Sequence, residues 1–429
     1  SSARRGTGSA DIPGDTKSDL ESRIANLRSA IRDLPPVLHQ HRLLIVVLGA
    51  GLFLRLAWGL YQGGLVDPKL PDQREYLELA TNLLAGRGLV FHDPRFDADV
   101  RAYRAPGYPF FLAALGASPQ AARAAQACLD ASTALAAYLL ARRWLSPGPA
   151  LVAAAAVAVN PFLVYFSGLI LSETLFICML AWGMDLLVRP RHALWGVVLL
   201  GLAVLVRPSA MLLPVVLAAA MPATLPLRRR AAWAMTGALV VAAVLFPWAA
   251  RNRLVLGGWV WTTTNGGITF LDGFHASASG ASNQAALFAP DELHRLKQAG
   301  ELQRNAYCAD KAWRWIAANP SALPRLSAAK LARTWSPVPL SEQYGRPTYR
   351  LAGAMYAIPF YSLVLLGLLR RRGGSMSLFL VLPALYFTVL HVASVGSLRY
   401  RMPAEPPLAV LAAAAASAPG RRRQNIAAT

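Results

Sequence analysis

Charged residues are scarce in this chain. Only 15% of its 429 residues are Asp, Glu, Lys or Arg, while 55% are hydrophobic, and the mean hydropathy is +0.38. Soluble domains carry about 25% charged residues. This composition excludes a water-soluble globular enzyme and predicts a protein of the lipid bilayer.

Cysteine is also scarce, with three residues at Cys128, Cys178 and Cys308. They form no CxxC or Cys/His spacing, so neither a disulfide framework nor a cysteine-based zinc site is predicted. The histidines of the polar segments show no HxxxH or HxE spacing that would indicate a metal site.

Acidic residues are few, 22 against 43 Lys and Arg, which leaves a formal net charge of +21. The basic residues stand in short clusters between apolar runs, as the positive-inside rule requires. The charge is therefore explained by topology and by contact with membrane lipids, and nucleic acid is excluded as a partner.

Apolar runs fill most of the chain. A spanning helix needs about 20 apolar residues, and the sequence predicts an all-α polytopic membrane protein with about ten transmembrane helices. The candidate segments are Leu43–Tyr61, Pro119–Leu140, Ala150–Tyr165, Ser172–Val188, Ala193–Val206, Ser209–Leu225, Ala231–Ala250, Leu351–Leu369, Ser377–Val395 and Pro403–Ala418.

Arginine clusters fall at every second connection, which predicts that both termini are cytoplasmic. Residues 1–42 form a cytoplasmic arm, in which the spacing over Ser18–Leu34 is that of an amphipathic helix, and residues 419–429 form a basic tail. Residues 43–418 form the transmembrane domain. Its long polar loops, 63–104 and 251–350, lie on the extracytoplasmic side, and the second contains a predicted helix from Pro290 to Ile316.

The first outer loop begins with Asp72. Apolar residues recur at helical spacing from Gln73 to Ala85, and Gly86 and Gly88 follow, which predicts a short amphipathic helix on the outer membrane surface. Asp72 with Glu75 fits a capping box, so one interpretation is that Asp72 only caps this helix. The other is that its carboxylate serves as a general base.

Glu173 and four arginines are further candidates. Glu173 stands at the outer end of a span, where an ionisable residue is a functional candidate by default, although it also suits an ion pair between helices. The four arginines lie on the predicted outer side, where the positive-inside rule does not explain them, and they suit the binding of a phosphate group. The alternative is that they contact lipid headgroups or pair with acidic residues of the loops. The four are Arg207, Arg251, Arg399 and Arg401.

An ordered series of short motifs resembles the GT-C superfamily, near the dolichyl-phosphate-mannose–protein mannosyltransferases and the aminoarabinose transferases. The series runs from Asp72 to Pro403 and comprises Asp72 with Tyr76 and Ala80, Arg104-Ala105-Pro106-Gly107-Tyr108-Pro109, Ser172-Glu173-Thr174, Val206-Arg207-Pro208-Ser209, Pro247-Trp248 with Arg251-Asn252, and Arg399-Tyr400-Arg401-Met402-Pro403. The resemblance implies a GT-C-like helix bundle with amphipathic helices in the first outer loop.

The resemblance also implies roles for individual residues. Asp72 is expected to be the catalytic base and Glu173 a second acid that shapes the site. The substrate-binding residues are expected to be Arg104, Tyr108, Arg207, Arg251, Arg399 and Arg401. Gln73 stands where many relatives have a second acid, which argues against a two-acid metal site, so a divalent metal is left open. The chain ends after its last span, which disfavours an oligosaccharyltransferase.

The sequence therefore predicts an inverting glycosyltransferase that moves a sugar from a polyprenyl-phosphate carrier to an extracytoplasmic acceptor, which is a protein, a glycan or a lipid. High Ala, Arg and Pro usage points to the cytoplasmic membrane of a GC-rich bacterium. Two alternatives remain: a lipid or sugar transporter or flippase, which would place polar residues near the bilayer centre, and a catalytically inactive GT-C-fold scaffold in envelope assembly.

Overall fold

The structure is a computed structural model. It describes residues 36–64, 66, 70–221, 225–284, 287–340, 346–370 and 374–417. The chain divides into two units, Ser1–Val46 and Val47–Thr429, and the architecture below is that of the second. The predicted helix at Ser18–Leu34 and the basic tail at 419–429 lie outside the described residues.

Five helices among the described residues are long and apolar enough to cross a membrane. With a rise of 1.5 Å per residue, about 20 residues cover the hydrocarbon core. These helices are α2 (Pro36–Gln62), α5 (Pro119–Ala141), α11 (Leu227–Leu256), α16 (Pro347–Arg370) and α17 (Ser375–Val392).

The other five predicted spans are also helical but shorter or interrupted. The run Ala150–Tyr165 forms a pair of helices bent by 49°, because Asn160 ends one helix and accepts hydrogen bonds from the first backbone N–H groups of the next. The shorter elements are α6 (Pro147–Ala158), α7 (Pro161–Ser167), α8 (Glu173–Leu187), α9 (Ala193–Val206), η1 (Pro208–Ala210), α10 (Leu213–Ala219), η6 (Met402–Ala404) and α18 (Glu405–Ala415). Within the described ranges, the helices long enough to span a membrane thus number five, or six with the bent pair.

The centre of the bundle is α18, in which every residue from Glu405 to Ala415 is buried. It packs against α5, α6, α16 and α17, and Gly367 of α16 lies against the carbonyl of Leu411 with no space for a Cβ. Helices in lipid associate through such close approaches of small residues, which explains the alanine-rich sequence of α18.

The first outer segment forms α3 (Pro71–Leu84), the hairpin β1 (Phe91–Asp93) and β2 (Ala98–Val100), and α4 (Gly107–Ala114). The predicted amphipathic helix is confirmed as α3, which buries Tyr76, Leu79 and Ala80 on one face. The predicted capping box is wrong. The helix begins at Pro71 after Leu70, no side chain caps it, and Asp72 and Glu75 instead bind arginine.

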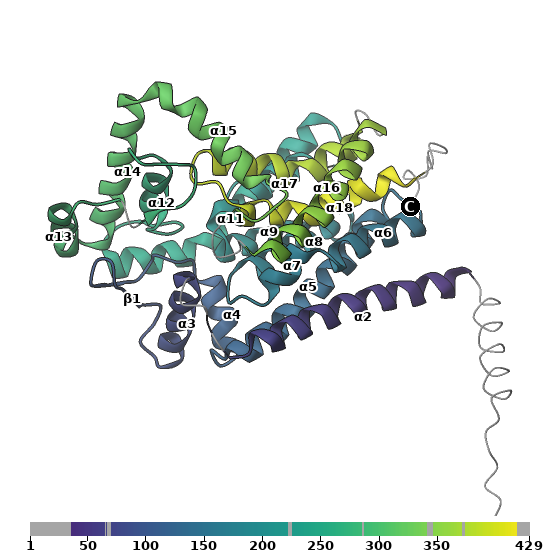
Figure 1. The fold of residues 1–429 in the computed structure, drawn as a ribbon, viewed down its shortest axis with the longest axis horizontal. Helices are drawn as coiled ribbons and strands as arrows, with labels where there is room; N and C mark the ends of the chain where they lie inside the picture. Colours follow the sequence, from purple (N-terminus) through teal and green to yellow (C-terminus); the bar gives the residue numbers. More distant parts are fainter. Residues whose placement is uncertain are drawn as a thin grey trace, which may run out of the picture. The chain divides into compact units, whose positions relative to one another are not determined.

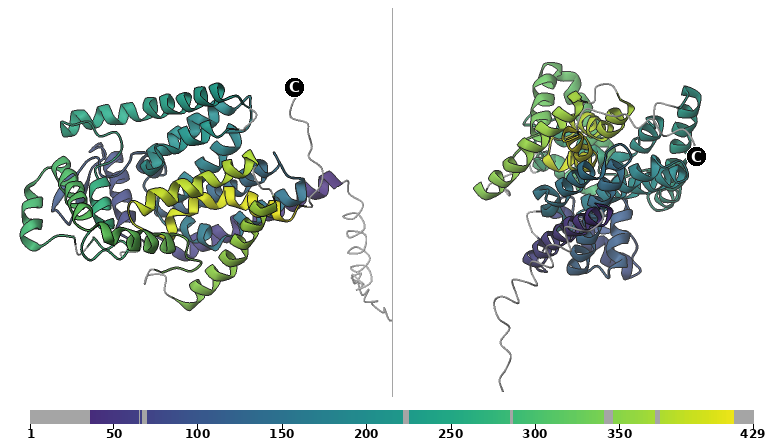
Figure 2. Two further views of the ribbon diagram at one scale, coloured as in Figure 1. Left: turned by 90° about the horizontal axis from the view of Figure 1, so that it is seen from above. Right: turned by 90° about the vertical axis from the view of Figure 1, so that its right-hand side faces the viewer.

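The second outer segment forms α12 (Gly266–Gly273), α13 (Pro290–Gln298), α14 (Glu301–Ala318), η3 (Pro320–Ala322) and α15 (Leu323–Thr334). The predicted helix at Pro290–Ile316 is two helices, because the chain is extended at Ala299 and Gly300. These helices gather at the same end of the second unit as α3 and β1 (Figure 1, Figure 2).

Glu301 joins the two outer segments. Its carboxylate accepts hydrogen bonds from the backbone N–H of Arg101 at 2.7 Å and of Ala102 at 2.9 Å, and also from the hydroxyl of Thr264. The backbone N–H of Thr264 donates to the carbonyl of Ala102 at 2.9 Å. The two segments therefore hold each other beside the site described next.

Candidate active site

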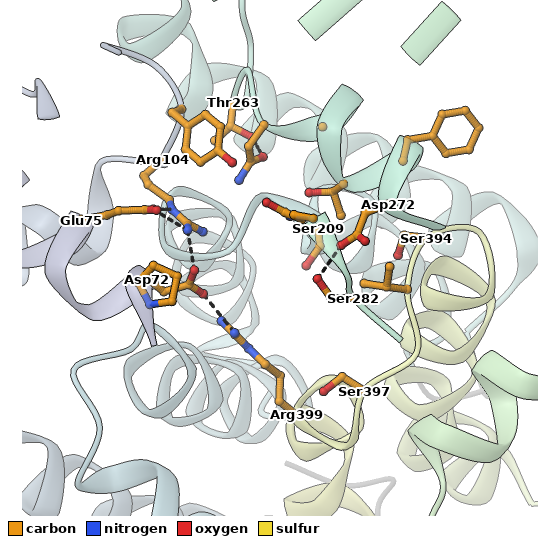
Figure 3. A pocket seen from close by; sticks show the side chains of 18 of the residues that line it. Asp72, Glu75, Arg104, Ser209, Thr263, Asp272, Ser282, Ser394, Ser397 and Arg399 are labelled. Atoms are coloured by element: carbon orange, nitrogen blue, oxygen red, sulfur yellow. Dashed lines mark hydrogen bonds and ion pairs between the residues drawn. The ribbon is translucent and has the colours of Figure 1, made fainter. Parts of the chain in front are cut away.

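A polar cavity of about 1890 Å³ lies between the two outer segments. Its walls come from α3, the chain before α4, η1, α12, the 279–284 loop and the 390–400 segment. Ligand pockets usually measure about 300–1,000 Å³, so this cavity is large enough for more than one small molecule. Figure 3 shows Asp72, Glu75 and Arg104 on one side of the space, and Asp272 with Ser282 on the other.

Asp72 lies in this cavity with both carboxylate oxygens bound to arginine. Arg104 Nη2 donates to Oδ1 at 2.7 Å, and Arg399 Nη1 donates to Oδ2 at 3.0 Å. Arg104 also donates to Glu75 Oε2 from Nε at 2.7 Å and from Nη2 at 2.5 Å. The ion pairs to Asp72 join residues that stand 32 and 327 positions apart in the sequence (Figure 3).

Arg399 extends the chain of ion pairs to Glu173. Its Nε donates to Glu173 Oε1 at 2.5 Å, and Arg207 Nη1 donates to the same oxygen at 2.9 Å. The Glu173 side chain is fully buried, and its Oε2 has no hydrogen-bond partner among the described residues. Glu173 therefore holds two arginine side chains side by side at the cavity.

These acids and arginines form one alternating series, Glu75–Arg104–Asp72–Arg399–Glu173–Arg207. We refer to it as the ion-pair series. Burial by itself would raise the pKa of Asp72, but the charges and hydrogen bonds of Arg104 and Arg399 outweigh it and hold the pKa below the usual 3.8. Asp72 is therefore a carboxylate at neutral pH.

Aromatic rings support the arginines of the ion-pair series. Tyr400 lies under the guanidinium of Arg207 at 5.5 Å and of Arg399 at 5.9 Å, and His391 stacks on Tyr400 with 3.7 Å between ring centroids. Arg104 lies over the ring of Tyr76 at 5.3 Å. Cation–π contacts of this kind orient arginine without neutralising its charge.

A hydroxyl- and amide-rich wall forms another side of the cavity. Asp272, at the end of α12, accepts hydrogen bonds from Ser282 Oγ at 2.5 Å and from the backbone N–H of Asn283 at 2.7 Å. We define the acceptor wall by its lining residues Thr263, Thr269, Asp272, Ser282, Asn283 and Ser394, of which Thr263, Asp272, Ser282 and Ser394 are labelled in Figure 3.

A glycine junction connects the acceptor wall to the segment that carries Arg399. The backbone N–H of Gly396 donates to the carbonyl of Gly280 at 2.8 Å. A Cβ at Gly396 would overlap the backbone of Lys330, and a Cβ at Gly273 would overlap the carbonyl of Ser394. Only glycine permits these approaches, so the position of Arg399 depends on α12 and α15 as well as on its own segment.

A smaller apolar cavity of about 230 Å³ adjoins the polar one. It is lined by aromatic and aliphatic residues of α7 and α16, and it shares Arg333, Leu340, Gly396, Ser397 and Arg399 with the polar cavity. Arg333 Nε is buried and has no hydrogen-bond partner among the described residues. The border between an apolar and a polar space is therefore marked by two arginines.

The structure brings Asp72, Glu173, Arg104, Arg207 and Arg399 together, as the ion-pair series shows. Glu173 is fully buried behind these arginines and is not itself in the lining of the polar cavity. The other three predicted residues are also absent from that lining. The Tyr108 hydroxyl donates to Gln126 at 2.6 Å, Arg251 donates to the carbonyls of Arg101 and Leu89, and Arg401 pairs with Glu405 at 3.1 Å.

Sequence reasoning missed Asp272, Glu75 and Arg333 as residues of this cavity. Glu75 was interpreted only as part of a capping box. The other two stand in the long outer segment without any motif, so no local signal could have set them apart. Their common position follows from the packing of α12 and α15 against the segment 390–400.

The donor set does not fit a metal ion. No group of three or more His, Cys, Asp or Glu residues within the described ranges could hold one. The three acids of the ion-pair series are each neutralised by arginine, and a cation at Asp72 would have to displace two guanidinium groups. No step through a metal is derived for this site.

No family model and no curated protein matches the chain. Two solved structures of the oligosaccharyltransferase AglB from Archaeoglobus fulgidus are similar to it at 13% identity. One, in complex with an inhibitory peptide and a dolichol-phosphate, has a TM-score of 0.51, and the apo form has 0.52. Each match covers 88% of this chain and 50% of the archaeal one.

The chain thus spans about half the length of the structures it resembles. At this identity the similarity establishes the fold and leaves the reaction to the chemistry of the site. The predicted helical membrane fold is confirmed, and this chain shares the fold of the archaeal oligosaccharyltransferase over the matched region.

Proposed function

We propose that the chain is an integral membrane glycosyltransferase that moves one sugar from a polyprenyl-phosphate carrier to an acceptor hydroxyl, with inversion at the anomeric carbon. The observation that carries this proposal is the position of Arg399. It lines the polar cavity, where it binds Asp72, it binds the buried Glu173, and it also lines the adjoining apolar cavity.

The two adjoining cavities suit the two parts of such a donor. The apolar cavity accepts the prenyl chain near its phosphate. Arg333, Arg399 and Arg207 are within the same region and can bind the phosphate oxygens. The dolichol-phosphate in the AglB complex supports a carrier of this kind, because the two chains share a fold.

The transfer breaks the bond between the sugar C1 and the phosphate oxygen and forms a bond between C1 and the acceptor oxygen. The electron pair of the broken bond leaves on the carrier phosphate, whose developing charge the arginines stabilise. Asp72 takes the proton of the acceptor hydroxyl as the new bond forms. The products are the glycosylated acceptor and the polyprenyl phosphate.

Asp72 can act as a base only after one of its oxygens becomes free, because both accept from arginine in this structure. The donor phosphate competes with Asp72 for Arg399. When the phosphate takes that arginine, Asp72 loses one of the two cations that lower its pKa and gains an oxygen able to accept a proton. Binding of the donor thus prepares the base.

The proposed enzyme lies in a bacterial cytoplasmic membrane with its cavity on the extracytoplasmic side and both termini in the cytoplasm. The arrangement of the arginine clusters supports this orientation. A divalent metal is not required by the steps above.

The decisive experiment measures sugar release from a panel of radiolabelled polyprenyl-phosphate sugars in membranes that contain either wild type or Asp72→Asn. The proposal expects wild type to release sugar from at least one donor, and it expects the variant to be about 10²–10⁴-fold slower, because a general base contributes that much. Asp291→Asn, an exposed acid on α13, is the matched control.

Three outcomes would contradict the proposal. Equal rates for wild type and Asp72→Asn would remove Asp72 as the base. Tight binding of a polyprenyl phosphate with no sugar release from any donor would favour the inactive scaffold, whereas movement of an unmodified lipid across vesicles would favour the flippase.

A further inference from the structure

The acceptor wall faces the ion-pair series across the polar cavity, and the proposed transfer to a hydroxyl leaves its role open (Figure 3). The donor sugar and phosphate need the arginine side. The cavity of about 1890 Å³ exceeds a usual small-molecule site of about 300–1,000 Å³, so a second substrate has room beside the donor.

The chemistry of the wall is that of a polyol site. Asp272 is 1% exposed, and its carboxylate is oriented by Ser282 and the Asn283 N–H. A carboxylate has about four lone-pair positions, and these two hydrogen bonds use two of them. Around it stand hydroxyl and amide groups, which both donate and accept.

We propose that the acceptor wall binds an uncharged saccharide, with the Asp272 carboxylate accepting hydrogen bonds from two of its hydroxyl groups. This inference rests on the proposed function for the identity of the second substrate. Adjacent hydroxyls on a sugar ring present paired donors to one carboxylate, and the remaining hydroxyls can exchange hydrogen bonds with Ser394, Thr269 and the side chain of Asn283.

A peptide acceptor suits this wall less well. Extended peptides are held by adding a strand to a sheet edge or by side-chain pockets. Among the described residues the strands are β1 and β2, which pair with each other in the first outer segment, and the wall itself comes from a helix end and loops. Its lining offers side-chain hydroxyl and amide groups.

The test measures binding directly. Purified full-length protein in nanodiscs is titrated with three uncharged trisaccharides, mannotriose, arabinotriose and maltotriose, and with a six-residue peptide rich in Ser and Thr. Saturation-transfer NMR detects binding without turnover. At least one trisaccharide is expected to bind wild type, with no competition from the peptide.

Three variants locate the binding. Asp272→Asn keeps an oxygen for the Asn283 N–H but loses the charge, and we expect about ten-fold weaker trisaccharide binding, as for loss of one charge-assisted hydrogen bond. Asn283→Ala keeps its backbone bond to Asp272 and should weaken binding without a folding defect. Asp291→Asn on the exposed face of α13 should bind as wild type does.

Release of the donor sugar to water, measured on the same samples, separates this inference from the proposed function. Asp291→Asn, whose substitution lies outside the cavity lining, should release it at the wild-type rate. Trisaccharide binding that depends on Asp272 in a protein without donor release would refute the glycosyltransferase and keep the saccharide site. Peptide binding in place of the trisaccharides, or trisaccharide binding unchanged in Asp272→Asn and Asn283→Ala, would overturn the inference.

Discussion

Arg399 and Arg401 stand two residues apart in one motif, yet they lie in different surroundings. Arg399 pairs with Asp72 and Glu173, and 24% of its side chain is exposed at the cavity. Arg401 is fully buried, pairs with Glu405 at 3.1 Å and donates to the carbonyl of Ser336. A ligand can reach Arg399 and rearrange its ion pairs, whereas the buried Arg401–Glu405 ion pair is closed to a ligand.

The closed pair is part of a larger structural cluster. Glu405 also accepts from the hydroxyl of Tyr361 at 3.0 Å and from the side-chain amide of Asn160, and these residues join α7, α16 and α18. A buried ion pair costs desolvation that its partners must offset. Arginine on the outer side therefore has two roles here, one catalytic by proposal and one structural.

The largest expected effect concerns Arg399 and its ion pairs at the cavity. Arg399→Ala should lower sugar transfer by about 10²–10³-fold, because removal of one group that stabilises developing charge has this consequence. The variant should remain folded. Arg399→Lys should recover part of the rate, since lysine supplies the charge without the bidentate geometry. A wild-type rate for Arg399→Ala would show that this arginine does not touch the donor phosphate.

The second effect concerns the closed pair. Arg401→Met leaves Glu405 as an unpaired buried charge, and we expect a loss of about 3–5 kcal/mol in the free energy of unfolding. Thermal unfolding in detergent measures it, with Arg399→Met as the matched control that should unfold close to wild type. Adding Glu405→Gln to Arg401→Met should restore part of the loss.

The opposite result for Arg401 would contradict the assignment of a structural role to this residue. If Arg401→Met unfolded at the wild-type temperature and yet lost transfer, then Arg401 would be a substrate residue, as the sequence alone suggested.

The pH dependence of sugar transfer tests the proposed role of Asp72 as the general base. Because Arg104 and Arg399 hold the pKa of this carboxyl below 3.8, the proton leaves well below neutral pH. The value of kcat/KM for the donor reports the free enzyme, so it should show no acid limb from this group between pH 5 and 7. Arg104→Gln removes one cation, raises the pKa of Asp72 and should move the acid limb toward higher pH.

The smallest expected effect is that of chelation. The acids of the ion-pair series are neutralised by arginine, so they do not need a metal cation. EDTA should therefore leave the rate of sugar release within about two-fold of the untreated rate. Loss of activity that Mn²⁺ or Mg²⁺ restores would mean that a cation displaces these arginines.

Much of the fold could be predicted because its signals are local. The apolar runs place the five helices that are long enough to cross a membrane, and the alternation of Tyr76, Leu79 and Ala80 with polar residues places α3. The lengths of the shorter helices were harder to predict, because hydropathy averages over breaks such as the Asn160 cap between α6 and α7.

The candidate site was predictable in part for a related reason. Arg207 and Arg399 lie on the predicted outer side, although lysine and arginine usually favour the cytoplasmic side. Asp72 interrupts an apolar region. A charged residue is costly to keep at such a position, so each of the three could be recognised as a candidate. Asp272 and Arg333 lie in a long polar segment, where such residues are common and carry no signal.

By itself, the sequence determined that this is a membrane protein, where its helices lie and which polar residues are unusual, because hydropathy and charge act locally along the chain. Only the tertiary structure decided that Arg399 binds Asp72 across 327 positions, that Arg401 is closed off with Glu405, and that Asp272 faces the same cavity. Those outcomes depend on how helices and loops distant in sequence pack, and no local pattern encodes the partner of an ion pair.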